Sequence, residues 1–106
     1  MFLSNTESVP GARITRTLGL VNGNTVRAKH LGRDIMAGFR NLAGGELTAY
    51  TELLVESRNE AIHRMVPQAQ GMGANAVVNV RFTTAAVAPG ATEIYAYGTA
   101  VVLADA

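Results

Sequence analysis

The stretch that most constrains the fold is residues 93–103, EIYAYGTAVVL, because as a strand it is apolar on both faces. Successive side chains of a strand point to opposite sides of the sheet. One face would carry Ile94, Ala96, Gly98, Ala100 and Val102, and the other Tyr95, Tyr97, Thr99, Val101 and Leu103. The first face is small in its middle, so a helix can lie close over it. The second face also needs a cover; no other segment is an obvious one, so a neighbouring subunit is the simplest.

Residues 74–84, ANAVVNVRFTT, predict a strand that pairs with this one. The short loop AVAPGAT between the two favours an antiparallel hairpin. Regular alternation would place Ala76, Val78, Val80 and Phe82 on one face, and Val77, Asn79, Arg81 and Thr83 on the other.

A further extended region is predicted from Ala12 to Ala28, where β-branched residues are frequent. Gly19 interrupts this run and indicates a bulge or close packing. Asn22-Gly23 is a strong turn dipeptide. The region is therefore either one long strand or two short paired strands.

Two helices are predicted between these strands. Residues 31–45 have the apolar spacing of a short amphipathic helix, which Gly44-Gly45 would terminate. A long helix follows from about Glu46 to Met72. Its buried stripe is predicted to contain Leu47, Tyr50, Leu54, Ala61, Met65 and Ala69, widened by Leu53 and Ile62. Pro67 removes the hydrogen bond to the His63 carbonyl, which predicts a kink or a split, and Gly71 and Gly73 would end the helix.

The expected element order is strand, short helix, long helix, strand, strand. This order predicts an α+β fold of two layers, in which a small antiparallel sheet packs on the long helix. A chain of 106 residues fits a single domain, residues 1–106.

Composition points to assembly and argues against several partners. Charged residues make up only 16% of the chain, which suggests that another subunit covers part of the surface. The net charge of +1 without a basic block gives no indication of nucleic-acid or membrane binding. There is no cysteine, no signal-peptide pattern at the start and no apolar run long enough to cross a bilayer. We therefore expect a soluble, cytoplasmic homo-oligomer.

Five motifs carry a family resemblance: LGLVNG, GRDIMAGFRNLAGGE, AYTELLVESR, GANAVVNVRF and YGTAVV. Their order and spacing resemble the YbjQ-like family, also called UPF0145, over nearly the whole chain. The most specific positions are Arg33-Asp34, Gly44-Gly45, Tyr50, Arg58, residues 73–77 and residues 98–101. The resemblance implies a dodecin-like β-α-β-β subunit and a ring-shaped homopentamer, in which short extra strands help the subunits to join. The family carries the label "putative heavy-metal-binding", and the resemblance supplies no catalytic residues.

The sequence offers few donors for such a metal. Soft metals prefer thiolate and thioether ligands, but there is no cysteine and the four methionines are dispersed. Glu60 and His63 are spaced as Glu-x-x-His, with Glu56 one turn upstream, so these three residues are the candidate metal ligands. They would form half of a site that an interface completes. The competing interpretation is a solvated helix face with an ion pair between Glu60 and Arg64.

A second candidate cluster consists of Asp34, Arg40, Glu46, Tyr50 and Arg58. Tyr50 lies on the predicted apolar stripe and Arg58 falls near the same face. Asp34 is the natural carboxylate partner for Arg58, because the family pattern contains both residues. The cluster would bind a small anion in a pocket between subunits, or it would be an ion pair that joins two helices or sets the subunit register.

Three functions are consistent with these patterns. The first is a non-enzymatic homo-oligomer that binds a metal ion or a small ligand at its interfaces; no other cofactor is indicated. The second is an enzyme with an interface active site that uses Asp34, Tyr50 or Arg58, although no pair of nucleophile and base is recognisable. The third is a structural or adaptor ring that recruits another protein.

Overall fold

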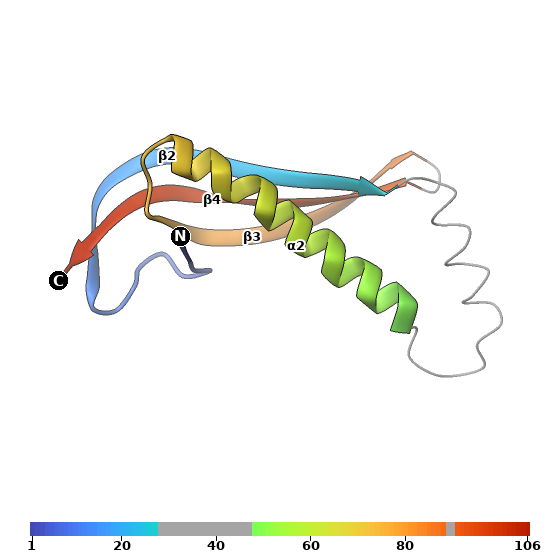
Figure 1. Ribbon diagram of the computed structural model, residues 1–106, viewed down its shortest axis with the longest axis horizontal. Helices are drawn as coiled ribbons and strands as arrows, with labels where there is room; N and C mark the ends of the chain where they lie inside the picture. Colours follow the sequence, from blue (N-terminus) through green and yellow to red (C-terminus); the bar gives the residue numbers. More distant parts are fainter. Residues whose placement is uncertain (28–47, 89–90) are drawn as a thin grey trace.

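One helix packs against a four-stranded mixed sheet in the computed structural model, which describes residues 1–27, 48–88 and 91–106 (Figure 1). The elements are β1 (Phe2–Leu3), β2 (Ala12–Arg27), α2 (Thr48–Gly71), β3 (Ala76–Ala88) and β4 (Ala91–Asp105). The predicted α+β architecture of two layers is confirmed. The helix predicted over residues 31–45 lies outside the described residues.

The sheet has the strand order β1-β3-β4-β2. The antiparallel hairpin predicted for the last two strands is confirmed, and β2 pairs antiparallel with β4. The expectation of a purely antiparallel sheet is wrong, because β1 pairs parallel with β3 and Phe2 lies opposite Ala76. Two residues are too short a run to show strand periodicity. Their pairing depends on backbone bonds instead: Phe2 N donates to Asn75 O over 3.1 Å, and Ser4 N donates to Val77 O over 2.9 Å.

β2 is one continuous strand, so Asn22-Gly23 does not form a turn. Gly23 is required here for another reason. A Cβ at this position would overlap the Ala61 carbonyl oxygen and would lie 2.6 Å from the Met65 backbone nitrogen. The backbone of α2 therefore crosses β2 directly above Gly23, where only glycine leaves enough room. The register between β2 and β4 shifts between Thr17 and Gly19, which confirms the irregularity predicted at Gly19.

A bulge in β3 changes which side chains share a face. Asn79 has a φ of 55°, and the register with β4 shifts between Val78 and Arg81. Residues 79 and 80 both lie opposite Gly98. As a result Val80 packs with the core under α2, whereas Val78 belongs to a cluster on the opposite face. The predicted placement of Val78 and Val80 on one face is wrong, because regular alternation does not allow for an inserted residue.

The main core lies between α2 and the sheet (Figure 1). Its buried members are Val21, Ala61, Met65, Ala69, Val77, Ile94, Ala96 and Ala100. The small residues in the middle of β4 do accept the helix, as predicted. The helical stripe is confirmed at Ala61, Met65 and Ala69, while Leu54 and Ile62 are partly buried against the same core.

The helix ends where the glycines predict. Gly73 has a φ of +87° and donates its N–H to Gln70 O over 3.0 Å. Ala74 N donates to Ala69 O over 3.1 Å. This pair of bonds is a Schellman motif, in which the left-handed residue is normally glycine.

Pro67 does not split α2, which runs without interruption from Thr48 to Gly71. The residue removes only the bond to the His63 carbonyl. Both residues are exposed, so water can satisfy that carbonyl at little cost. The predicted split is therefore wrong.

The face of the sheet opposite α2 is covered at one end by the chain itself. Val101 is 1% exposed in a cluster with Ala76 and Val78, and Val9 and Leu103 pack against this cluster. The N-terminal segment therefore provides a cover that residues 93–103 alone do not reveal. The rest of this face is described below.

Candidate functional site

The other end of that face is open and carries exposed apolar side chains among polar ones. We call it the open face and define it by Leu20, Val26, Tyr95, Tyr97 and Thr99. Asn22 and Asn24 lie on the same face between Leu20 and Val26, because the residues that alternate with them on β2 point toward α2. Leu20 is 80% exposed and Val26 52% exposed, and the rings of Tyr95 and Tyr97 contact each other at a centroid distance of 5.6 Å. Isolated exposed apolar residues are common, but several of them around a pair of tyrosines are typical of an interaction surface.

Polar groups lie among the apolar side chains of the open face. Asn24 Nδ2 donates to Glu93 Oε2 over 2.9 Å, and both residues belong to the strands that carry the open face. Apolar side chains combined with polar groups that are hydrogen-bonded are the usual composition of a protein interface.

The outer edge of β2 is partly closed by α2. Asn22 N donates to Gln68 Oε1 over 2.7 Å, and Arg64 Nη1 donates to Asn24 O over 2.7 Å. Two helix side chains thus occupy backbone groups that another strand would otherwise pair with. Sequence reasoning missed the contacts that these two residues make with β2, because their partners are 46 and 40 positions away along the chain.

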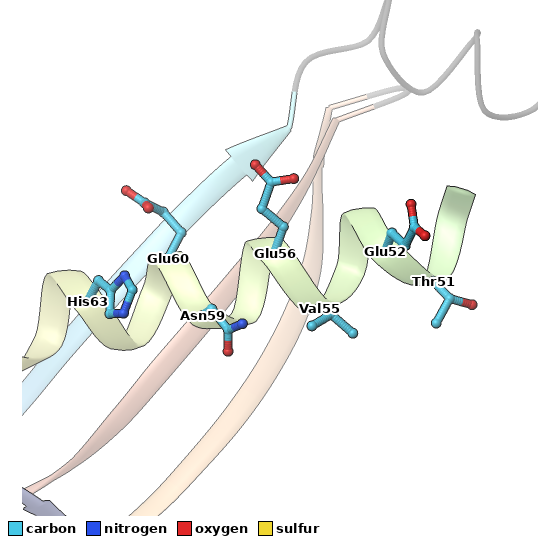
Figure 2. Close-up of a pocket in the computed structure, with 7 residues that line it drawn as sticks. All are labelled: Thr51, Glu52, Val55, Glu56, Asn59, Glu60 and His63. Atoms are coloured by element: carbon cyan, nitrogen blue, oxygen red, sulfur yellow. The ribbon is translucent and has the colours of Figure 1, made fainter. Parts of the chain in front are cut away.

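The predicted metal ligands share one groove on the exposed side of α2. The groove has a volume of about 460 Å³ and is lined by Thr51, Glu52, Val55, Glu56, Asn59, Glu60 and His63. Figure 2 shows Glu56 and Glu60 projecting to one side of the helix, with Val55 and Asn59 on the other. The structure therefore brings Glu56, Glu60 and His63 to the same surface, as their spacing predicts.

These donors do not form a complete metal site within one chain. Among the described residues, no three His, Cys, Asp or Glu side chains are arranged to hold a metal ion. Glu60 instead accepts a 3.1 Å bond from Arg64 Nε, which is the ion pair of the competing interpretation. The groove offers the imidazole of His63 and the carboxylates of Glu52 and Glu56, with a third carboxylate, Glu60, that is already paired.

The second predicted cluster is only partly visible. Arg58 is exposed on α2, and Tyr50 lies in the first turn of the same helix. Asp34, Arg40 and Glu46 lie outside the described residues. The predicted partnership of Arg58 with Asp34 therefore stays a prediction.

Sequence reasoning also missed Ser57, which is fully buried between α2 and β2. Its hydroxyl donates to Leu53 O over 2.8 Å, and its own carbonyl accepts a 3.3 Å bond from Thr25 Oγ1. The sequence signal for this burial was that Ser57 is small and precedes Ala61 by four positions, which places both residues on the same face of the helix. This contact ties the helix to the strand and is structural.

The helix is not a membrane span. Over the parts of the chain described here, no helix is both long and apolar enough to cross a bilayer.

Comparison with known proteins gives one consistent result. A family described as "Putative heavy-metal-binding" matches residues 1–104. A UPF0145 protein from Hahella chejuensis is 61% identical over 103 residues, covering 97% of this chain and 99% of the relative. A UPF0145 protein from Halorubrum lacusprofundi is 58% identical over 101 residues, covering 95% and 97%.

A solved structure supports the fold. The crystal structure of a protein of unknown function from the DUF74 family of Pediococcus pentosaceus aligns with a TM-score of 0.65. The alignment covers 98% of both chains at 14% identity, so it concerns the fold alone. The matches to the family and to its close relatives identify this chain as a member of the YbjQ-like family, UPF0145.

Proposed function

We propose that the protein is a cytoplasmic homo-oligomer, a ring of five subunits as the family resemblance implies, which binds a metal ion or a small ligand at its subunit interfaces. The observation that carries the proposal is the open face. Its most exposed side chain, Leu20, has 80% of its surface in water. Burying a leucine side chain stabilises an assembly by roughly 1.5–3 kcal/mol, and several such residues lie together here.

Two surfaces of the chain favour a head-to-tail arrangement. The open face and the groove on α2 lie on opposite sides of the molecule, because α2 covers the other face of the sheet. A contact between two different surfaces closes into a ring when the rotation between subunits allows it. In such a ring the groove would face a second copy, whose side chains could complete a set of ligands.

The mass in solution tests the assembly. Light scattering at micromolar concentration should give a mass several times the 11.1 kDa of one chain, and about 55 kDa for five subunits. A monodisperse species of 11.1 kDa would contradict the proposal.

The donors of the groove restrict the metal that could bind. Glu56 and His63 supply carboxylate and imidazole, and the chain has no thiolate to offer. These ligands suit a borderline ion such as Zn²⁺ better than a soft heavy metal. Because one chain provides so few of them, the ion would need donors from another copy.

Thermal unfolding with added Zn²⁺ tests this part of the proposal. After EDTA treatment, Zn²⁺ at about 100 times its Kd should stabilise the protein by about 2.7 kcal/mol, a rise in Tm on the order of 10 °C. His63→Ala should remove most of that rise. Glu7→Gln removes an exposed carboxylate outside the groove and should not affect it.

Two further outcomes would each favour one of the alternative functions. If neither Zn²⁺ nor a panel of small metabolites changes the Tm of an intact oligomer, ligand binding is excluded and the alternative of a structural or adaptor ring is favoured. Turnover that is lost in Arg58→Ala while the oligomer persists would favour the enzyme alternative instead.

A further inference from the structure

A second groove lies on the side of the sheet that carries α2, at the edge formed by β3 and the N-terminal segment. It has a volume of about 460 Å³, and its main lining residues are Leu3, Asn5, Ile62, Val80, Arg81 and Phe82. This volume lies within the roughly 300–1,000 Å³ range of small-molecule sites. None of its residues lines the groove that holds His63. Arg81 lies opposite Tyr97 in the register, so it leaves β3 on the side of the open face.

The floor of this groove continues the hydrophobic core. Leu3, Ile62 and Val80 are each partly buried against the main core cluster. Phe82 follows on β3 and is 42% exposed, so part of its ring is available to a ligand. An aliphatic chain placed here would extend the core and cover apolar surface that now faces water.

Arg81 brings a guanidinium group to the rim of this groove. Because Arg81 lies opposite Tyr97 in the register, its side chain leaves β3 on the face away from α2 and reaches the groove at the edge of the strand. Asn79 N donates to Thr6 O over 3.0 Å, and Val80 N donates to Ser4 O over 2.9 Å, so the N-terminal segment is held beside the bulge. Arg81 then reaches the same segment, where its Nη1 donates to Asn5 O over 2.5 Å and to Val80 O over 3.1 Å.

Most of the hydrogen-bonding capacity of Arg81 is unused. A guanidinium carries five N–H donors, and both bonds are made by Nη1. Within residues 1–27, 48–88 and 91–106, Nε and Nη2 make no hydrogen bond, and the ion pair found there joins Arg64 to Glu60. The Nε and Nη2 donors form the planar fork that matches the two oxygens of a carboxylate.

We propose that this groove binds a small organic anion that carries one carboxylate on an aliphatic tail. Arg81 pairs with the carboxylate through Nε and Nη2, and the tail lies along Ile62 and Phe82. A single guanidinium balances a single negative charge. The apolar lining disfavours a strongly hydrated anion without a tail. The proposal does not depend on oligomerisation or on metal binding.

Octanoate is the probe that tests the site in the full-length wild-type protein. Calorimetry should show saturable binding, and the δ-methyl resonance of Ile62 should shift. The methyl of Ile14 should not shift, because Ile14 pairs with Leu103 on the opposite face of the sheet. Hexanoate should bind up to about 15-fold more weakly, since each methylene contributes about fourfold. Octanamide, which has no charge, should bind at least about tenfold more weakly.

Two variants test whether Arg81 binds the carboxylate of the ligand and whether Phe82 contacts its aliphatic tail. Arg81→Gln should weaken octanoate binding at least about tenfold and abolish the preference over octanamide. Arg13→Gln is the matched control, because it removes an equally charged, exposed arginine from β2. Phe82→Thr should reduce the advantage of octanoate over hexanoate while the preference for a carboxylate remains.

Three outcomes would overturn the proposal. They are failure of octanoate to bind the wild type at millimolar concentration, equal affinity for octanoate and octanamide, and unchanged affinity in Arg81→Gln. The first outcome includes the case in which a second copy of the chain fills the groove. If Arg81→Gln does not fold by circular dichroism, the comparison of octanoate with octanamide on the wild type decides.

Discussion

Single residues decide how closely α2 approaches the sheet. Gly23 lies beneath the helix backbone at Ala61 and Met65, where any side chain would collide with main-chain atoms. Its sequence neighbour Asn22 makes it resemble a turn residue, because Asn-Gly is the commonest local signal for a hairpin. The requirement for glycine comes from a helix about forty positions further along the chain, so local patterns cannot reveal it.

Gly23→Ala should therefore destabilise the protein by about 1–3 kcal/mol, the usual cost of overpacking, because a rigid helix backbone must move. The Tm should fall by several degrees in calorimetry. Gly71→Ala is the matched control. A Cβ there meets nothing, so its stability should be unchanged or slightly higher. Equal stability of the two variants would contradict the close approach at Gly23.

At the scale of elements, periodicity predicted the long helix well and the strands less well. The stripe through Ala61, Met65 and Ala69 follows from spacing within one helix. The face of the sheet on which Val80 lies does not follow from spacing, because a single inserted residue at Asn79 reverses the alternation of the residues after it. That bulge also places Arg81 opposite Tyr97, on the face away from α2, and its guanidinium reaches Asn5 O at the strand edge beside the proposed carboxylate site.

The side chains of Arg64 and Gln68 on α2 cap the outer edge of β2. Arg64→Ala combined with Gln68→Ala should expose the backbone groups of Asn22 and Asn24. Water can replace these bonds, so the expected loss of stability is small, about 1 kcal/mol or less. Association through the open edge should increase, visible as higher scattering on concentration or heating.

The control for this variant is Arg13→Ala combined with Gln70→Ala, which removes two exposed side chains of the same types that do not contact the backbone of Asn22 or Asn24. If both double variants associate to the same extent, Arg64 and Gln68 do not protect the edge.

The whole molecule is long and thin. It measures 54 × 26 × 16 Å, and its radius of gyration is 17.1 Å, against about 13 Å for a compact chain of this length. One helix cannot cover both faces of strands as long as β2 and β4. The N-terminal segment covers Val101, and the open face around Leu20 stays in water. The shape therefore supports assembly with other copies.

Leu20→Lys should disrupt the assembly and leave the subunit folded, because it places a charge on the open face while Leu20 makes little contact within the chain. The measured mass should fall, and the Tm should no longer rise with protein concentration. Met72→Lys alters another exposed apolar residue, at the end of α2, and should retain the mass of the wild type. An unchanged mass in Leu20→Lys would show that the open face is not the interface.

The sequence by itself determined the helix, its buried stripe, its glycine end and the two-sided apolar character of residues 93–103. These features depend on residues within about one helical turn or on strict alternation, and short-range spacing encodes both. Only the tertiary structure decided the parallel β1, the bulge at Asn79, the capped edge of β2 and the half of the sheet face that stays open. Each of these depends on contacts between residues far apart in the chain, such as Asn22 with Gln68, whose geometry no local pattern records.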